Sequence, residues 1–236
     1  MQHLENGQKV MLLASCSYML HPVIAVLRKW GIPFHNPYRK SNGFWNPLRH
    51  GRKGSSTNRI LSLLGPHPWT HRDLKLWAVW LNTKGNLRTG AKELIEASDD
   101  SLPVTIERLN ELFEIAALES LLAASSDSRQ LLQWWSRRVA PTFHGRVQFP
   151  VAVALAGGQG ALEESPRVIV GTIHSVKGRR GGCRLSLSGS QPSRRRGLPE
   201  ARTQRDSVIR LLYVGLTRAR HTLYICQRES SMAVLV

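Results

Sequence analysis

The chain has 236 residues, 42% of them hydrophobic, and a formal net charge of +17. That length allows one large domain or two small ones, and that apolar content is enough to form a core. No 18-residue apolar run is present and the first ten residues are polar, which excludes a membrane span and a signal peptide. Three scattered cysteines without metal-ligand spacing indicate reduced thiols and a cytoplasmic location. The positive charge favours an anionic partner, most commonly nucleic acid.

The first part of the chain predicts a β-α-β unit. A continuous apolar run at Val10–Ser15 is typical of a buried parallel strand. Apolar residues at helical spacing predict a helix over His21–Trp30, with a proline in its first turn and a glycine after its end. Ile32–Phe34 is a candidate second strand, so the unit favours a parallel sheet. Residues 36–60 are rich in Asn, Pro, Gly, Arg and Lys and are predicted to form a loop.

A helical block follows. Thr70 and Asp73 form a candidate capping box. The spacing then predicts helices over Gly90–Ala97, Pro103–Ala124 and Ser128–Val139. The tryptophans of this block could stack on nucleic-acid bases, but at helical spacing they are better explained as core residues.

Beyond the helical block the α/β pattern resumes. Gln148–Leu155 alternates and predicts a strand or a linker, and Ala156–Gly160 predicts a flexible connector without phosphate-loop spacing. After it, the pattern predicts a strand, a helix and a closing strand over Arg167–Thr172, Asp206–Arg220 and His221–Cys226.

Two stretches match known motifs. Thr172-Ile-His-Ser-Val-Lys-Gly178 directly follows a predicted strand, and Arg210-Leu-Leu-Tyr-Val-Gly-Leu-Thr-Arg-Ala-Arg220 lies on a predicted helix. The first resembles motif V (TxHxxKGxE) and the second motif VI (RLxYVxxTRA) of the UvrD/Rep/PcrA DNA helicases of superfamily 1. The two motifs occur in the family's order, each on the expected element.

The resemblance implies an α/β fold in which a RecA-like, P-loop-NTPase-type parallel sheet, the second motor lobe, is interrupted by a helical insertion. Residues 1–45 would begin the lobe and correspond to the motif IV region. Residues 46–145 would form the insertion, similar to an accessory subdomain. Residues 146–236 would complete the lobe with motifs V and VI.

The resemblance also assigns nucleotide-binding residues. Arg218 would be the arginine finger that reaches the γ-phosphate of ATP, and Arg210 would support it; these two are the candidate catalytic residues. Lys177 and Gly178 would form a turn beside the nucleotide. Arg220 is better explained as a solvated helix residue.

Other motif residues are assigned to DNA or to packing. Thr172, His174 and Ser175 would contact single-stranded or forked DNA, where hydroxyl groups bind the phosphate backbone without reading sequence. Tyr213 and Thr217 would pack beside the nucleotide site.

Several parts of the motor are missing from the sequence. No Walker A motif or acidic pair after a buried strand is present, so the ligands of Mg²⁺ are expected from a first RecA-like lobe supplied elsewhere. Ser15 stands where motif IV normally carries an arginine. The sequence therefore predicts a helicase lobe that is active only with a first lobe. The alternative is an inactive remnant that binds nucleic acid through its basic surface.

Residues 179–205 do not fit the family pattern. They hold eight arginines against one acid, Glu200, where an apolar strand is expected. Gly181–Pro192 can be encoded by bases that in a neighbouring frame read Glu-Ala-Asp-Val-Val-Tyr-Leu-Phe-Pro-Asp-Leu-Ser. We therefore expect this stretch to be disordered or frameshifted, and sequencing the gene tests the second idea. The alternative is a diverged basic loop.

Overall fold

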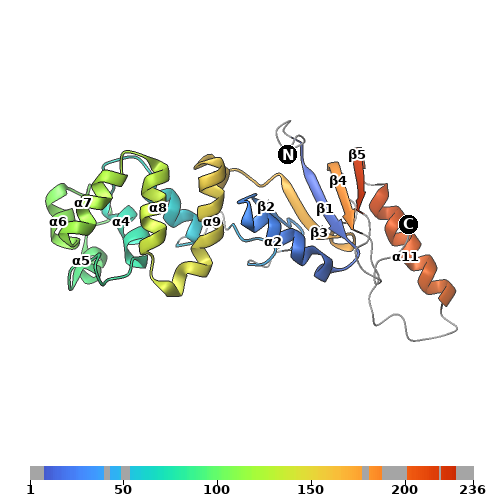
Figure 1. The fold of residues 1–236 in the computed structure, drawn as a ribbon, viewed down its shortest axis with the longest axis horizontal. Helices are drawn as coiled ribbons and strands as arrows, with labels where there is room; N and C mark the ends of the chain where they lie inside the picture. The colour runs from blue at the N-terminus through green and yellow to red at the C-terminus, as the bar shows by residue number, and fades with distance from the viewer. Residues whose placement is uncertain are drawn as a thin grey trace. The chain divides into compact units, whose positions relative to one another are not determined.

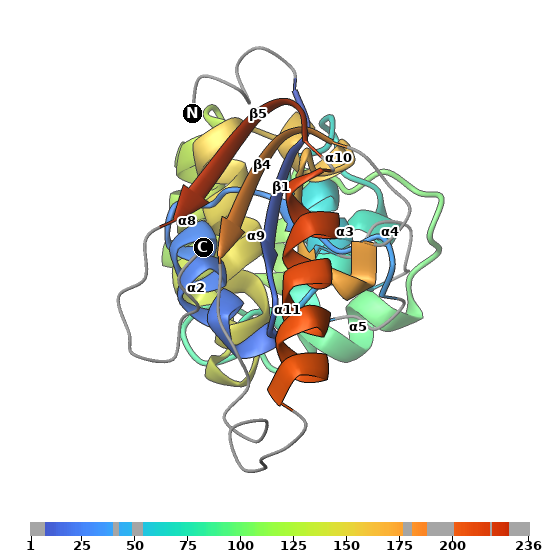
Figure 2. The same ribbon diagram turned by 90° about the vertical axis from the view of Figure 1, so that its right-hand side faces the viewer.

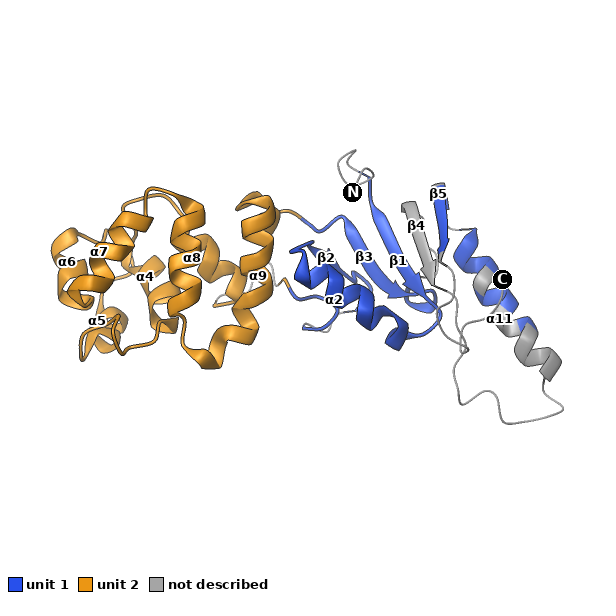
Figure 3. Cartoon of the chain, viewed as in Figure 1, with its two compact units in different colours: residues 1–47, 165–236 blue, residues 48–164 orange. Residues whose placement is uncertain are grey.

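The structure is a computed structural model that describes residues 8–39, 43–48, 54–176, 181–187, 201–217 and 219–226. Its helices and strands are labelled in Figure 1. The protein is mixed α/β and divides into two compact units, coloured separately in Figure 3. Unit 1 comprises residues 1–47 and 165–236, and unit 2 comprises residues 48–164. The first boundary lies two residues from the expected one, whereas the second lies at 164/165 rather than 145/146.

Unit 1 is built on a parallel sheet with strand order β2-β3-β1-β4-β5. Its strands are β1 (Val10–Ala14), β2 (Phe34–His35), β3 (Val168–Thr172), β4 (Gly181–Leu187) and β5 (Ala219–Cys226). Strand β1 lies in the middle, where Val10 pairs with Val168 on one side and Cys183 on the other. The parallel sheet predicted from the sequence is confirmed. Strand β2 begins at Phe34, the last residue of the predicted strand, and ends one residue later.

Both faces of the sheet are covered. Leu12 and Val170 are buried on one face, while Met11 and Leu13 are buried on the other, where residues of α11 (Ala201–Leu216) pack. The crossovers β1→β2 and β4→β5 run in opposite directions across the sheet, so right-handed connections place their helices on opposite faces. Figure 2 shows α2 (His21–Lys29) and α11 on the two sides of the strands.

The arginine-rich stretch contains regular structure. Residues 181–187 form strand β4, which pairs with both β1 and β5, and the helix that follows begins at Ala201. The expectation of disorder is therefore wrong for these two segments, whereas 179–180 and 188–200 lie outside the described residues. A strand forms there because the backbone between β1 and β5 hydrogen-bonds to both neighbours whatever its side chains are.

The end of α11 also differs from the prediction. The helix ends at Leu216, and Ala219 and Arg220 belong to β5 rather than to the helix. The Thr217 hydroxyl donates to the Tyr213 carbonyl at 2.9 Å, which satisfies an acceptor that the helix end leaves free.

Unit 2 is helical throughout its regular structure. Its α-helices are α3 (Ser56–Leu63), α4 (His71–Trp77), α5 (Ala91–Ala97), α6 (Ile106–Leu112), α7 (Ile115–Ala124), α8 (Ser128–Arg138), α9 (His144–Gly157) and α10 (Gly160–Glu163). Single 3-10 turns occur at Ala78–Trp80 and Pro141–Phe143. Trp77, Trp80, Trp134 and Trp135 are buried, so the prediction that these tryptophans are core residues is confirmed.

Helix starts follow their capping residues. The Thr70–Asp73 capping box is present as predicted, and the Thr70 hydroxyl also donates to the Asp73 carboxylate at 2.7 Å. Burial raises the pKa of Asp73, but hydrogen bonds from Ser62 and Thr70 outweigh it and hold that pKa below its usual value. Ser55 caps α3, so the predicted loop over 36–60 is wrong from Ser56 onward.

Two other helix predictions need correction. The helix predicted over Pro103–Ala124 breaks at Phe113 and Glu114, whose backbones are extended because Leu87 pairs with Phe113 and Glu114 donates to the Asn86 carbonyl. The alternating Gln148–Leu155 is not a strand but lies within α9. Val147, Phe149, Val151 and Val153 are all buried, because this helix is covered on several sides.

None of the helices in the described ranges has both the length and the apolar character that crossing a bilayer requires.

Candidate functional site

The carboxyl ends of β1 and β3 lie side by side, because Ala14 pairs with Thr172 at the end of both strands. Open parallel sheets bind their ligands at this edge. The chain leaves β3 through a 3-10 turn at His174–Val176, and the Ile173 amide donates back to the Ala14 carbonyl at 2.9 Å. The predicted DNA-contacting residues Thr172, His174 and Ser175 therefore lie together at this edge.

Thr172 and Ser175 fix the turn after β3. The Ser175 amide donates to Thr172 Oγ1 at 3.3 Å, and Ser175 Oγ donates to the Thr172 carbonyl at 2.8 Å. Because Thr172 Oγ1 accepts here, its own proton remains able to donate to a phosphate oxygen. His174 is exposed and makes no hydrogen bond or ion pair within the described part of the chain. The turn thus offers one hydroxyl donor and one exposed imidazole.

The second motif stretch packs directly against this turn. Ile173, 1% exposed, belongs to an apolar cluster with Met11, Leu13 and Ile169, against which Leu211 and Val214 of α11 pack. A Cβ atom added to Gly215 would lie 3.0 Å from Ile173 Cδ1. Because this distance is shorter than an ordinary carbon–carbon contact, alanine at position 215 would require the Ile173 side chain or α11 to shift.

Other predicted residues of α11 face outward. Arg210 is exposed and has no hydrogen bond or ion pair among the described residues. Tyr213 is 68% exposed and Thr217 is exposed as well, so neither is a core residue of this unit. The remaining predicted nucleotide residues, Lys177, Gly178 and Arg218, lie outside the described residues.

We expect Gly215→Ala to lower the free energy of unfolding by about 1 kcal/mol, since overpacking against Ile173 outweighs the gain in helix propensity. The matched control is Gly145→Ala in α9, where an added Cβ meets nothing within 4 Å, and this change should be neutral or slightly stabilising. Urea denaturation followed by circular dichroism compares the two. Equal effects of the two substitutions would show that the Gly215 contact carries no constraint.

The loop after β1 lacks the charge that motif IV would supply. Ser15 follows the strand, and its hydroxyl donates weakly to the sulfur atoms of Met19 at 3.6 Å and Cys16 at 3.8 Å. The predicted replacement of an arginine by Ser15 therefore leaves a neutral, partly buried hydroxyl beside β1.

Sequence reasoning missed a closed loop after β2. Asn36 is fully buried and donates its amide to Asn46 Oδ1 at 2.7 Å, while its own Oδ1 accepts from the Tyr38 amide at 3.0 Å. Asn46 Nδ2 also donates to the Arg39 carbonyl at 2.7 Å. Such Asn-to-backbone bonds mimic backbone turns, so the asparagines flanking the prolines were a usable signal.

This loop presents an aromatic and basic cluster, which we call the Phe44 cluster. Phe44 is 38% exposed. The centroids of the His21 and Phe44 rings lie 4.9 Å apart in a T-shaped arrangement, and the Arg28 guanidinium lies 5.8 Å from the Phe44 ring centroid. Trp45 packs beside Phe44 at 5.3 Å. An exposed ring beside a guanidinium and other aromatic rings is the kind of surface on which an unpaired base stacks.

Comparison with known proteins found no family model that matches the chain and no curated protein that matches it significantly.

Proposed function

We propose that this chain is the second, RecA-like motor lobe of an ATP-dependent DNA helicase similar to UvrD, Rep and PcrA. It would supply the arginine finger and the contacts to single-stranded DNA. A first lobe would supply the phosphate-binding loop and the ligands of Mg²⁺. The two motif stretches carry the resemblance, and both lie in the unit that contains the parallel sheet.

One observation supports the proposal most. Ile173 of the first stretch packs against Gly215 of the second, so two sequences that are separated by about 40 residues contact each other. In a motor, such contact lets a shift of the strand-binding turn be transmitted to the helix that bears the nucleotide-contacting arginines. This coupling needs no polar contact between the two stretches.

The outward orientation of Arg210 fits a nucleotide held by a separate lobe. Its guanidinium is exposed and lacks an internal carboxylate partner among the described residues, so it is able to bind phosphate oxygens. ATP with Mg²⁺ would supply the transferable phosphoryl group. In this chain, Arg210 and Arg218 would only position and neutralise it.

A salt series tests the DNA-binding half of the proposal. The full chain should bind a labelled single-stranded oligonucleotide with an affinity that falls steeply and log-linearly with salt concentration. Thr172→Ala should weaken binding about 3- to 10-fold, the effect of losing one hydrogen bond to a phosphate. The matched control is Thr142→Ala, which removes an exposed hydroxyl in unit 2. Absent or salt-insensitive binding would contradict the proposal.

The alternative function is a catalytically inactive remnant that binds nucleic acid through its charge. The Phe44 cluster favours it, because base stacking on a basic surface needs no nucleotide site. Phe44→Ala, measured in the same binding assay, distinguishes the inactive remnant from the motor lobe. A loss larger than that of Thr172→Ala assigns the main contact to the Phe44 cluster, and a smaller loss assigns it to the turn after β3.

A further inference from the structure

Helix α7 has an unusual outward face. Its inner face buries Ala117, Leu118, Leu121 and Ala124. Helical spacing gathers the exposed residues on the opposite side, which we call the α7 outer face: Ile115, Ala116, Glu119, Leu122 and Ala123. Ile115 is 65% exposed and Leu122 is 39% exposed. A surface helix normally turns polar residues outward, whereas this face is apolar except for Glu119.

The neighbouring helix α8 shows that this is not a general property of unit 2. Its exposed residues include Arg129, Gln130 and Arg137, which are the polar types expected on a solvated helix. Exposed apolar residues also occur in the chain ahead of α7, at Leu94, Leu102 and Ile106. Within the described part of unit 2, the exposed large hydrophobic residues therefore all lie on the segment from α5 to α7. Exposed apolar patches can mark interaction sites.

The same segment is strongly acidic in an otherwise basic protein. Residues 93–127 contain nine acids and a single basic residue, Arg108, which gives a net charge of −8 and leaves +25 for the rest of the chain. The nine acids are Glu93, Glu96, Asp99, Asp100, Glu107, Glu111, Glu114, Glu119 and Asp127, and all are exposed. Repulsion from this charge disfavours nucleic acid as the ligand of this segment.

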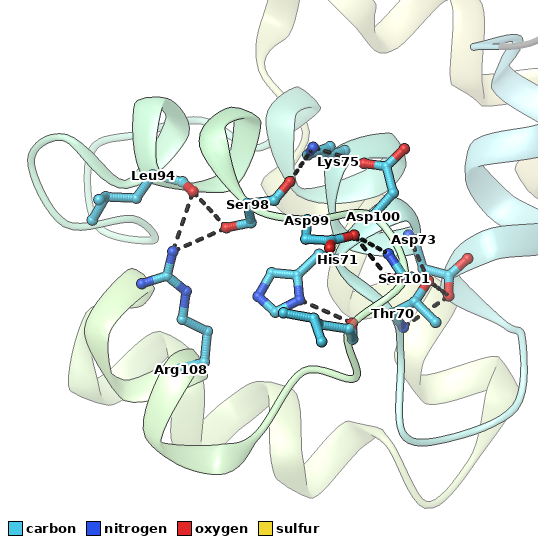
Figure 4. Close-up of polar contacts among 11 residues, drawn as sticks. Thr70, His71, Asp73, Lys75, Leu94, Ser98, Asp99, Asp100, Ser101 and Arg108 are labelled. Carbon is cyan, nitrogen blue, oxygen red and sulfur yellow. Dashed lines mark hydrogen bonds and ion pairs between the residues drawn. The ribbon is translucent and has the colours of Figure 1, made fainter.

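Little of this negative charge is neutralised internally. Among the described residues, the acids of the segment form two ion pairs, Lys75–Asp100 at 2.7 Å and Arg108–Glu111 at 2.6 Å. Figure 4 shows Arg108 turned toward the Leu94 carbonyl and the Ser98 hydroxyl, and Lys75 beside Asp100. Hydrogen bonds from Ser101 also hold the pKa of Asp99 below its usual value, so this carboxylate stays charged.

We propose that the α7 outer face is a docking site for a cationic amphipathic helix of a partner protein. The apolar side of that helix would cover Ile115 and Leu122. Its lysines or arginines would meet Glu114 and Glu119, which border the apolar residues on the same helix. This mode of recognition places a helix in contact with an apolar stripe and uses charge for orientation. It does not depend on whether the chain is a motor lobe.

The test uses the full chain and a labelled, helical leucine–lysine peptide of about five turns. A second peptide has the same composition but a scrambled order without an apolar face. The amphipathic peptide should bind at least tenfold more tightly than the scrambled one in fluorescence anisotropy. Ile115→Lys/Leu122→Lys should abolish that difference, and Glu114→Gln/Glu119→Gln should weaken binding at least threefold and reduce its salt dependence.

The matched control is Val26→Lys/Trp30→Lys, which makes the same charge change at two exposed apolar residues, one in α2 and one at its C-cap, and should leave peptide binding unchanged. Unchanged melting temperatures show that the variants remain folded. Equal binding of both peptides, or equal losses in both lysine variants, would overturn the proposal. Sedimentation showing self-association that Ile115→Lys/Leu122→Lys removes would assign the face to a second copy and overturn it as well.

Discussion

Replacing Arg218 by alanine should reduce ATP turnover about 10³-fold or more in a protein that combines this chain with a first RecA-like lobe. In the transition state, negative charge builds on the oxygens of the transferred phosphoryl group, and a guanidinium from the second lobe stabilises it through two donors. Binding of single-stranded DNA should change little, because the DNA contacts that we propose lie on the turn after β3. Steady-state ATPase assays and DNA titration measure the two effects separately.

The control for Arg218 is Arg220→Ala, which removes the same charge two residues further along, where the resemblance assigns no role. Arg220 belongs to β5. Comparable turnover in the Arg218 and Arg220 variants would remove the arginine-finger assignment. Arg210→Ala should have an intermediate effect, since the resemblance gives Arg210 a role in supporting the proposed finger.

The second large effect concerns the tryptophan core of unit 2. Trp135 is completely buried, and its Nε1 donates to the Trp77 carbonyl at 3.0 Å, joining α8 to α4. Trp135→Ala should lower the free energy of unfolding by about 3–5 kcal/mol, the typical cost of removing a buried aromatic side chain. Far-ultraviolet circular dichroism in urea follows the loss of helix.

A paired substitution separates packing from hydrogen bonding. Trp77 is equally buried, but its Nε1 has no hydrogen-bond partner in the described part of the chain. Trp77→Phe removes a buried donor without a partner, which offsets part of the lost packing, whereas Trp135→Phe removes a donor that is bonded. We therefore expect Trp77→Phe to cost less than Trp135→Phe. Equal costs would mean that the lost ring volume alone determines stability here, and the reverse order would contradict the hydrogen-bond argument.

Elements with one dominant pattern could be predicted from the sequence. The apolar run at β1, the helix over His21–Lys29 and the Thr70 capping box each have a local cause, and the structure contains all three. The break at Phe113 could not be predicted, because its cause is pairing with Leu87, a residue distant in sequence. The strand or linker predicted at Gln148–Leu155 was wrong for a related reason. The alternating apolar residues of α9 are buried by neighbours that the sequence does not specify.

The candidate site was predictable in its components and not in its packing. The motif pattern located Thr172 and Ser175, and they form the turn after β3. The pattern did not indicate why position 215 is glycine, because the reason is an atom of Ile173. The exposure of Tyr213 could not be predicted either, since the spacing of apolar residues along one helix does not specify which side of it packs against the sheet.

Strand β4 bears on the reading-frame hypothesis. Its backbone lies between β1 and β5, where Met11 pairs with Arg184 and Leu12 with Leu185. The alternative frame would place valine at both 184 and 185, the residue type that buried parallel strands favour. The hypothesis therefore predicts an apolar central strand at the same place where the structure has one of mixed character.

The division into two units also determines the order in which parts of the chain can fold during synthesis. Residues 48–164 are contiguous, so unit 2 can fold as soon as its last helix has left the exit tunnel. Strand β1 is synthesised first, yet its neighbours β3 and β4 come only after the whole of unit 2. Until then Val10–Ala14 is an apolar segment with open hydrogen-bonding edges on both sides. The time during which β1 can aggregate is therefore set by how long the ribosome takes to synthesise unit 2 and the strands that follow it.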